Sequence, residues 1–134
     1  MNQGAVSQAV GAHHRICRSD ELSDGGTGVR FEWVSDTGER QSAFVIRHAG
    51  VVTAYLNQCA HVPVELDWQP GVFLDDEGKF LVCATHGAVY RPSDGRCMGG
   101  PCRGRGLKSV PCYEFKGSVY AGLEPAARHL NQHE

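Results

Sequence analysis

Residues 83–90 have the sequence Cys-Ala-Thr-His-Gly-Ala-Val-Tyr, and residues 59–61 have the sequence Cys-Ala-His. Thiolates are soft ligands that suit zinc and iron–sulfur sites, and imidazoles also suit iron. A single cysteine or histidine is usually a packed residue, but two Cys/His pairs in loops after predicted strands can converge on one site. The pattern therefore predicts a metal centre with the ligands Cys59, His61, Cys83 and His86.

Zinc is the main alternative metal, because it also takes sites of two cysteines and two histidines. Classical zinc fingers pair cysteine with cysteine and histidine with histidine, whereas both pairs here are mixed, first as C-x-H and then as C-x₂-H. Mixed pairs fit a binuclear iron cluster better, in which one iron takes the cysteines and the other takes the histidines. Each loop then supplies one ligand to each iron.

The two pairs and their surroundings resemble the family of Rieske [2Fe–2S] proteins. Cys59-x-His61 and Cys83-x-x-His86-Gly87 resemble its two ligand boxes. Gly100-Pro101-Cys102 resembles the glycine-proline loop that covers the cluster. The resemblance extends over roughly residues 55–123. It implies an all-β fold of facing antiparallel sheets, with a cluster-binding tip formed by two loops.

The resemblance also implies individual roles around the cluster. Cys59 and Cys83 would ligate the inner ferric iron, and His61 and His86 would ligate the outer iron that changes to ferrous. Tyr90 matches a tyrosine that donates a hydrogen bond to a cysteine sulfur in the family, with core packing as its alternative role. The expected surroundings of the cluster are completed by Gly87, Gly100 and Pro101.

Three departures from the family pattern bear on the reduction potential. High-potential members carry an extra cysteine in each box and join the loops by a disulfide, but this chain has Val64 and Thr85 at those positions. Where such members have a serine that donates to a cluster sulfide, this chain has Ala88. Because fewer donors stabilise the reduced cluster less, we predict a potential nearer roughly −150 than +300 mV.

Size and composition indicate one globular domain. The chain has 134 residues, of which 41% are hydrophobic and 21% charged, as in ordinary globular proteins. Its 17 glycines and 6 prolines favour turns and short strands over long helices. We expect a loose segment over residues 1–12, one domain over residues 13–123 and a tail over residues 124–134.

Apolar and β-branched runs predict the strands of an all-β sandwich or small barrel. Residues 29–34 alternate as a half-buried strand does, and a hairpin is expected where Ala49-Gly50 joins residues 42–48 to residues 51–56. Further expected elements are strands over residues 79–82 and 89–90, a glycine-rich loop over residues 98–106, and a hairpin of residues 107–115 and 119–123.

Charge and hydropathy exclude several classes of partner. A net charge of −2 gives no basic face for nucleic acid. No apolar run approaches the roughly 20 residues of a membrane span, and residues 1–11 lack the pattern of a signal peptide. We therefore expect a cytoplasmic protein, in which six cysteines indicate metal or redox chemistry. In that compartment we expect Cys97 and Cys102 to be free thiols.

The resemblance implies a stand-alone, monomeric Rieske-type ferredoxin. Such a protein accepts an electron from a reductase and passes it to a terminal oxygenase or another oxidoreductase, without transforming a substrate. Catalytic Rieske oxygenases need a second domain with a mononuclear iron, for which we expect no room after residue 123. Two alternatives stay open, namely a cluster-bearing small subunit of a larger reductase and a zinc-binding structural domain.

Overall fold

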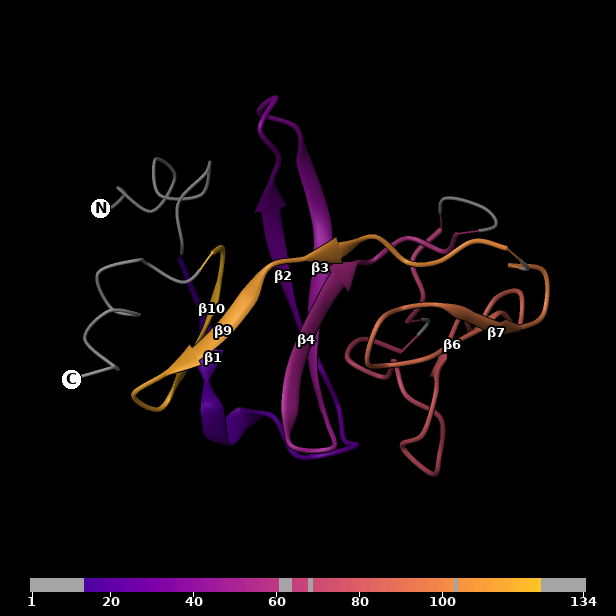
Figure 1. The fold of residues 1–134 in the computed structure, drawn as a ribbon, viewed down its shortest axis with the longest axis horizontal. Coiled ribbons are helices and arrows are strands. Elements are labelled where there is room, and N and C mark those ends of the chain that lie inside the picture. Colours follow the sequence, from indigo (N-terminus) through magenta and orange to yellow (C-terminus); the bar gives the residue numbers. More distant parts are fainter. Residues whose placement is uncertain (1–13, 61–63, 68, 103, 124–134) are drawn as a thin grey trace.

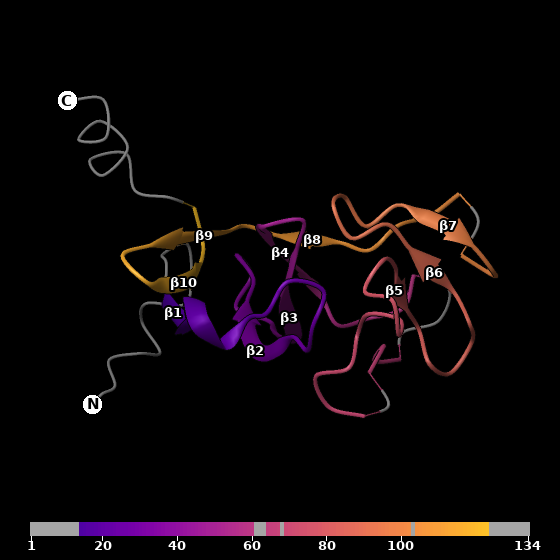
Figure 2. The ribbon, with the colours of Figure 1, turned by 90° about the horizontal axis from the view of Figure 1, so that it is seen from below.

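Three antiparallel sheets lie in a row along the long axis of the molecule (Figure 1). The computed structural model describes residues 14–60, 64–67, 69–102 and 104–123. The view turned by 90° shows the same row, with the middle sheet between the other two (Figure 2). The predicted all-β class is therefore confirmed. The expected loose segment and tail lie outside the described residues.

The first sheet has the strand order β1-β10-β9 and the middle sheet has the order β2-β3-β4-β8, while the third sheet has the order β5-β6-β7. A short 3₁₀ helix, η1 (Ser19–Glu21), follows β1. Nothing helical in the described part of the chain has the length and hydrophobicity of a membrane span. The strand bounds are β1 (His14–Arg18), β2 (Val29–Val34), β3 (Arg40–His48), β4 (Val51–Leu56), β5 (Leu81–Val82), β6 (Val89–Tyr90), β7 (Cys97–Gly99), β8 (Ser109–Val110), β9 (Cys112–Phe115) and β10 (Ser118–Ala121).

The middle sheet is buried on both faces, which explains the unbroken apolar run in β3. Successive side chains of a strand point to opposite faces, yet residues 43–46 are all 0% exposed. Ala43 and Val45 pack in the core shared with the first sheet. Phe44 and Ile46 pack in the core shared with the third sheet. The middle sheet therefore supports the third sheet and its loops from one side.

The central hairpin forms where the sequence predicts it. β3 pairs with β4 in a register that runs from Ala43 opposite Leu56 to His48 opposite Val51. The two turn residues, Ala49 and Gly50, have φ values of +54° and +81°. Two consecutive positive φ values match the right-handed twist of hairpin strands. The predicted strand over residues 29–34 is likewise confirmed as β2.

The expected strand over residues 107–115 is wrong in one respect, because it is divided between two sheets. β8 pairs with β4 in the middle sheet, and β9 pairs with β10 in the first sheet. Pro111 lies between them. Proline has no N–H to donate to a ladder, so the pairing stops there and the chain crosses from one sheet to the other.

The limits of two elements of the third sheet were also predicted wrongly. The expected glycine-rich loop begins inside β7, where Gly99 pairs with Val89. Pairing with a neighbouring strand outweighs the weak intrinsic preference of glycine for strands. Only Leu81 and Val82 of the expected strand over residues 79–82 are in strand conformation.

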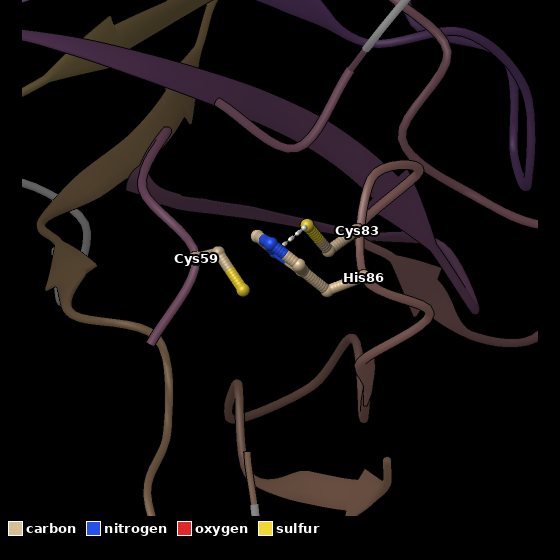
Figure 3. A group of neighbouring side chains, drawn as sticks. All are labelled: Cys59, Cys83 and His86. Carbon is tan, nitrogen blue, oxygen red and sulfur yellow. Dashed lines mark hydrogen bonds between the residues drawn. The ribbon is translucent and has the colours of Figure 1, made fainter. Parts of the chain in front are cut away.

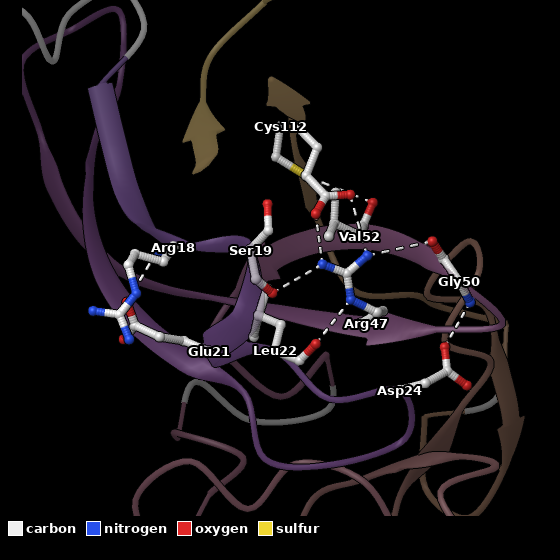
Figure 4. A network of polar contacts seen from close by, with 10 residues as sticks. Arg18, Ser19, Glu21, Leu22, Asp24, Arg47, Gly50, Val52 and Cys112 are labelled. Carbon is white, nitrogen blue, oxygen red and sulfur yellow. Dashed lines mark hydrogen bonds and ion pairs between the residues drawn. The ribbon is translucent and has the colours of Figure 1, made fainter. Parts of the chain in front are cut away.

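Arg47 of β3 ties the middle sheet to the first sheet (Figure 4). Its guanidinium donates to the carbonyl oxygen of Leu22 at 2.8 Å and to the carboxylate of Glu114 on β9 at 2.6 Å. The Arg47 side chain is only 16% exposed, and the hydrogen bond with Glu114 raises its pKa. The network therefore keeps a charged arginine between the middle sheet and the first sheet, away from the third sheet.

Candidate metal centre

Three of the four predicted ligands are positioned by the ends of short strands. β4 ends at Leu56 and leads within three residues to Cys59, while β5 leads directly into Cys83. His86 lies in the loop that joins β5 to β6. This loop is closed by hydrogen bonds from the Cys83 amide to the Ala88 carbonyl at 2.9 Å and from the Gly87 amide to the Cys83 carbonyl at 2.8 Å.

The ligand atoms of Cys59, Cys83 and His86 lie within 4.8 Å of one another. The Cys59 thiol approaches from one side, and Cys83 and His86 lie on the other (Figure 3). The Nδ1 atom of His86 is 3.9 Å from the Sγ atom of Cys83. The fourth predicted ligand, His61, lies outside the described residues, so its position stays a prediction.

The two ligand loops are joined to each other by backbone contacts. The Ala84 amide donates to the carbonyl oxygen of Leu66 at 3.0 Å, and the Cys59 amide donates to the Val64 carbonyl at 2.8 Å. The first contact crosses between the loops, and the second closes the loop that begins at Cys59. The positions of the two ligand loops relative to each other are therefore set by backbone hydrogen bonds.

The thiols are shielded from solvent, whereas His86 is at least partly exposed. Cys59 is 3% exposed and Cys83 is 0% exposed. Burial raises the pKa of the Cys83 thiol. A thiol must lose its proton to bind a metal, and burial makes that loss unfavourable. A metal cation at this position offsets the cost of forming the buried thiolate. The site thus has a dry sulfur side and an imidazole that solvent can reach.

Tyr90 connects the third sheet to the first ligand. Its hydroxyl oxygen accepts a hydrogen bond from the Ala60 amide at 3.0 Å and lies 3.3 Å from the Sγ atom of Cys59. Because the amide already donates to this oxygen, the hydroxyl proton is free to point at the sulfur. Burial raises the pKa of Tyr90, so the hydroxyl keeps this proton at neutral pH. The side chain is also 0% exposed, so it both packs and contacts the ligand.

We expect Tyr90→Phe to lower the reduction potential of the loaded protein. A hydrogen bond to a ligand sulfur stabilises the more negative, reduced state. A typical net hydrogen-bond contribution of about 1 kcal/mol corresponds to roughly 40 mV for one electron. Potentiometric titration followed by visible absorbance measures this shift.

Tyr55→Phe is the matched control for that substitution. The Tyr55 hydroxyl donates to the carbonyl oxygen of Pro92 at 2.6 Å, and burial raises its pKa to about 12. This variant also loses a buried hydrogen bond, but none to a ligand sulfur. If both variants shifted the potential equally, the contact between Tyr90 and Cys59 would have no specific effect.

The predicted covering loop lies against the second ligand loop. Gly100 has a φ of +84°, and a Cβ atom there would lie 2.8 Å from the carbonyl oxygen of Gly87 and 3.0 Å from the Cα atom of Ala88. Pro101, the next residue, is exposed. Glycine at position 100 therefore allows the covering loop to approach the backbone beside His86.

Gly100→Ala is expected to push the covering loop away from Gly87 and to accelerate loss of bound iron to a chelator several-fold. A left-handed conformation and a close backbone contact together cost on the order of 1–3 kcal/mol when a Cβ atom is added. Gly99→Ala is the control, because a Cβ atom there meets nothing within 4 Å. Equal rates of iron loss for the two variants would contradict the assigned contact.

A buried polar network beneath the first ligand loop was not predicted from the sequence. The Asn57 side-chain amide donates to the Asp67 carboxylate at 2.9 Å, and its oxygen accepts from the Leu66 amide at 2.8 Å. Arg30 of β2 donates to the same carboxylate at 2.8 and 2.9 Å. The Gly71 amide donates to it at 2.9 Å. The only sequence signal is that Asn57 and Asp67 flank the first ligand box.

This network keeps the Asp67 carboxylate charged inside the protein, where its side chain is 0% exposed. Burial acts to raise the pKa of Asp67, but the hydrogen bonds from Arg30, Asn57 and Gly71 outweigh it and hold the pKa below its usual value. The two ends of the first ligand loop are thus clamped by one ion pair and its hydrogen bonds.

The expectation of free thiols at Cys97 and Cys102 is wrong, because the structure joins them in a disulfide. The expectation rested on the compartment, and it did not consider distance. Pairing of β7 with β6 folds the covering loop back so that the two Cα atoms are 5.6 Å apart, within the range that a disulfide spans. Among the described residues, the cysteines outside this disulfide are Cys17, Cys59, Cys83 and Cys112.

An all-β fold that brings two buried thiols and an imidazole together from two loops offers the donor set of a metal centre, and these donors suit an iron–sulfur cluster. The chain belongs to the Rieske [2Fe-2S] domain family, whose model matches residues 12–114. Membership implies a [2Fe–2S] cluster, and the soft sulfur and imidazole donors fit this group. Among curated protein sequences, none matches the chain at a significant level.

Solved structures of Rieske proteins share the fold at low sequence identity. The ferredoxin of carbazole 1,9a-dioxygenase from Nocardioides aromaticivorans IC177 is 16% identical, with a TM-score of 0.63 over 84% of this chain and 98% of that one. The Sphingomonas yanoikuyae B1 ferredoxin is 22% identical, with the same TM-score and coverage. The terminal oxygenase of carbazole 1,9a-dioxygenase from the same Nocardioides strain is 23% identical with a TM-score of 0.66, but this chain spans only 32% of it.

Proposed function

We propose that this chain is a one-electron carrier whose [2Fe–2S] cluster is held by Cys59, His61, Cys83 and His86. The observation that carries the proposal is the convergence of three of these donors within 4.8 Å in a chain of the Rieske family. When bound, a Rieske cluster supplies one-electron redox chemistry at a potential above that of all-cysteine clusters.

The residues of the chain provide the surroundings that this role requires. Cys59 and Cys83 offer two thiolates in a water-excluded position. His86 gives an accessible edge, through which an electron can leave toward a docked protein. The Tyr90 hydroxyl lies 3.3 Å from the sulfur of Cys59 and would donate to it when that sulfur is a thiolate, and Gly100 brings the covering loop against the second ligand loop.

We infer that the partners are a reductase, as electron donor, and a terminal oxygenase or other oxidoreductase, as acceptor. A structural neighbour with a TM-score of 0.67 belongs to a complex of reduced oxygenase and oxidized ferredoxin in carbazole 1,9a-dioxygenase. In this proposal the chain acts as a single domain over residues 13–123 and transforms no substrate itself. A cytoplasmic location and a monomeric state stay predictions.

Low-temperature EPR of anaerobically purified protein after dithionite reduction tests the proposal, with iron and zinc measured on the same sample. We expect a Rieske-type signal and about two irons per chain. Stoichiometric zinc without a reducible signal, also after anaerobic reconstitution with iron and sulfide, would overturn electron transfer and favour a structural zinc domain.

A further inference from the structure

The Cys97–Cys102 disulfide closes the covering loop at its base. Only residues 98–101 lie between the two cysteines, and they include Gly100, which packs against Gly87 beside His86. A disulfide restricts the conformations of the chain that it closes. The bond therefore holds the covering loop in the conformation that contacts the second ligand loop.

The same disulfide is connected to the first ligand through the third sheet. Cys97 pairs with Tyr90 across β7 and β6, and the Tyr90 hydroxyl contacts the sulfur of Cys59. The two strands lie side by side at the end of the molecule that carries the ligand loops (Figure 1). A change at the disulfide can thus reach both ligand loops over one or two contacts.

The two cysteines of the bond differ in accessibility. Cys97 is partly exposed, whereas Cys102 is 0% exposed. A thiolate attacks one sulfur of a disulfide and displaces the other, and access decides which sulfur is attacked. Attack therefore occurs at Cys97, and Cys102 is the leaving group, which stays inside the protein close to its partner.

We propose that Cys97 and Cys102 form a reversible thiol–disulfide exchange site that controls how firmly the covering loop protects the cluster. The reductant is a dithiol. Its first thiolate forms a mixed disulfide with Cys97 and releases the Cys102 thiolate, which takes up a proton. Its second thiolate then displaces Cys97, which is also protonated. The protein disulfide gains two electrons and two protons, and the dithiol becomes a disulfide.

Reduction releases the base of the covering loop, so that Gly100 leaves Gly87 more often and solvent reaches the cluster edge. Local opening of this kind sets the access of small reagents to a buried group. The inference rests on the proposed cluster for its functional consequence. The exchange reaction and the release of the loop need only the residues of this chain.

The experiment measures loss of the cluster to an excess of an iron chelator, as bleaching of visible absorbance in anaerobic, reconstituted protein. The disulfide form and the form reduced by dithiothreitol are compared, and mass spectrometry after alkylation counts the thiols in each. We expect the cluster to be lost roughly tenfold faster after reduction. This factor is smaller than the largest effect that the loop-closure entropy of so short a disulfide loop allows.

The double variant Cys97→Ala/Cys102→Ala separates loop release from direct attack of the dithiol on the cluster. We expect it to lose the cluster at the fast rate with and without dithiothreitol. Cys112→Ala is the matched control, because this partly buried cysteine packs against the core shared by the first and middle sheets. It should respond to dithiothreitol as the wild type does.

Equal rates for the disulfide and dithiol forms of the wild type would overturn the inference, as would a double variant as slow as the disulfide form. If the chain takes up no iron, the proposed function is wrong and loss of the cluster cannot be measured. Hydrogen–deuterium exchange of the backbone amides of residues 98–100 in the metal-free protein then tests the inference, which still requires faster exchange after reduction.

Discussion

Replacing Cys83 with alanine is expected to leave the protein without its cluster. The Cys83 side chain is fully buried, and its sulfur is one of the two that converge with His86. Alanine removes the sulfur ligand without adding another donor group. We expect iron to fall from about two per chain to nearly none, measured by elemental analysis after reconstitution.

Cys112→Ala is the control for the loss of one partly buried cysteine sulfur outside the ligand loops. The Cys112 thiol lies 3.7 Å from the carbonyl oxygen of Val52, remote from the ligand loops, and burial raises its pKa to about 11. This variant is expected to keep its full iron content. A Cys83→Ala protein that kept the EPR signal and iron content of the wild type would remove Cys83 from the ligand set.

The part of the fold that could be predicted from the sequence depends on local pattern. Residues 29–34 alternate in polarity, and β2 is half-buried in the same alternation. The turn at Ala49 and Gly50 is likewise a local signal. The ligand pairs are identifiable because cysteine and histidine at short spacings are rare in loops unless they bind a metal.

The features that were missed depend on residues that are distant in sequence. Asp67 resembles any loop carboxylate until Arg30, 37 residues away, is brought beside it by the middle sheet. The disulfide depends on the pairing of β7 with β6, which the glycine-rich composition of residues 98–106 conceals. Division of residues 107–115 between two sheets does have a local signal in Pro111, which lies between β8 and β9 and whose missing N–H interrupts the strand pairing there.

We expect Asp67→Ala to destabilise the loaded protein strongly. It leaves the Asn57 amide and the Gly71 N–H without their shared acceptor, and it removes the buried one of the two carboxylates that Arg30 contacts, the other being that of Glu65. Leaving a buried donor unpaired costs about 1–3 kcal/mol, so the loss of the acceptor shared by Asn57 and Gly71 should cost about 3 kcal/mol, which lowers the midpoint of thermal unfolding of a domain this size by roughly 10 °C. Differential scanning calorimetry of the reconstituted protein measures this shift.

Glu32→Ala is the matched control, because Glu32 is on the same strand as Arg30 and pairs with Arg40 at 3.0 Å on the surface. Both of those side chains are more than half exposed, at 58% and 61%, so the loss should be below about 0.5 kcal/mol. Similar shifts for the two variants would show that burial of Asp67 adds nothing to the ion pair.

The pH dependence of Asp67→Asn separates the charge of this carboxylate from its shape. The folded-state pKa of Asp67 is lowered relative to the unfolded chain. Its charge therefore contributes stability that is fully present above the unfolded pKa of about 3.9 and is lost as the pH falls through the folded pKa. The difference in stability between wild type and Asp67→Asn should be constant near neutral pH and should shrink in strong acid. A constant difference down to the lowest pH at which the protein stays folded would contradict a role for the charge of Asp67 in holding the first ligand loop. The asparagine variant would then be less stable only because its side-chain amide makes poorer hydrogen bonds than the carboxylate.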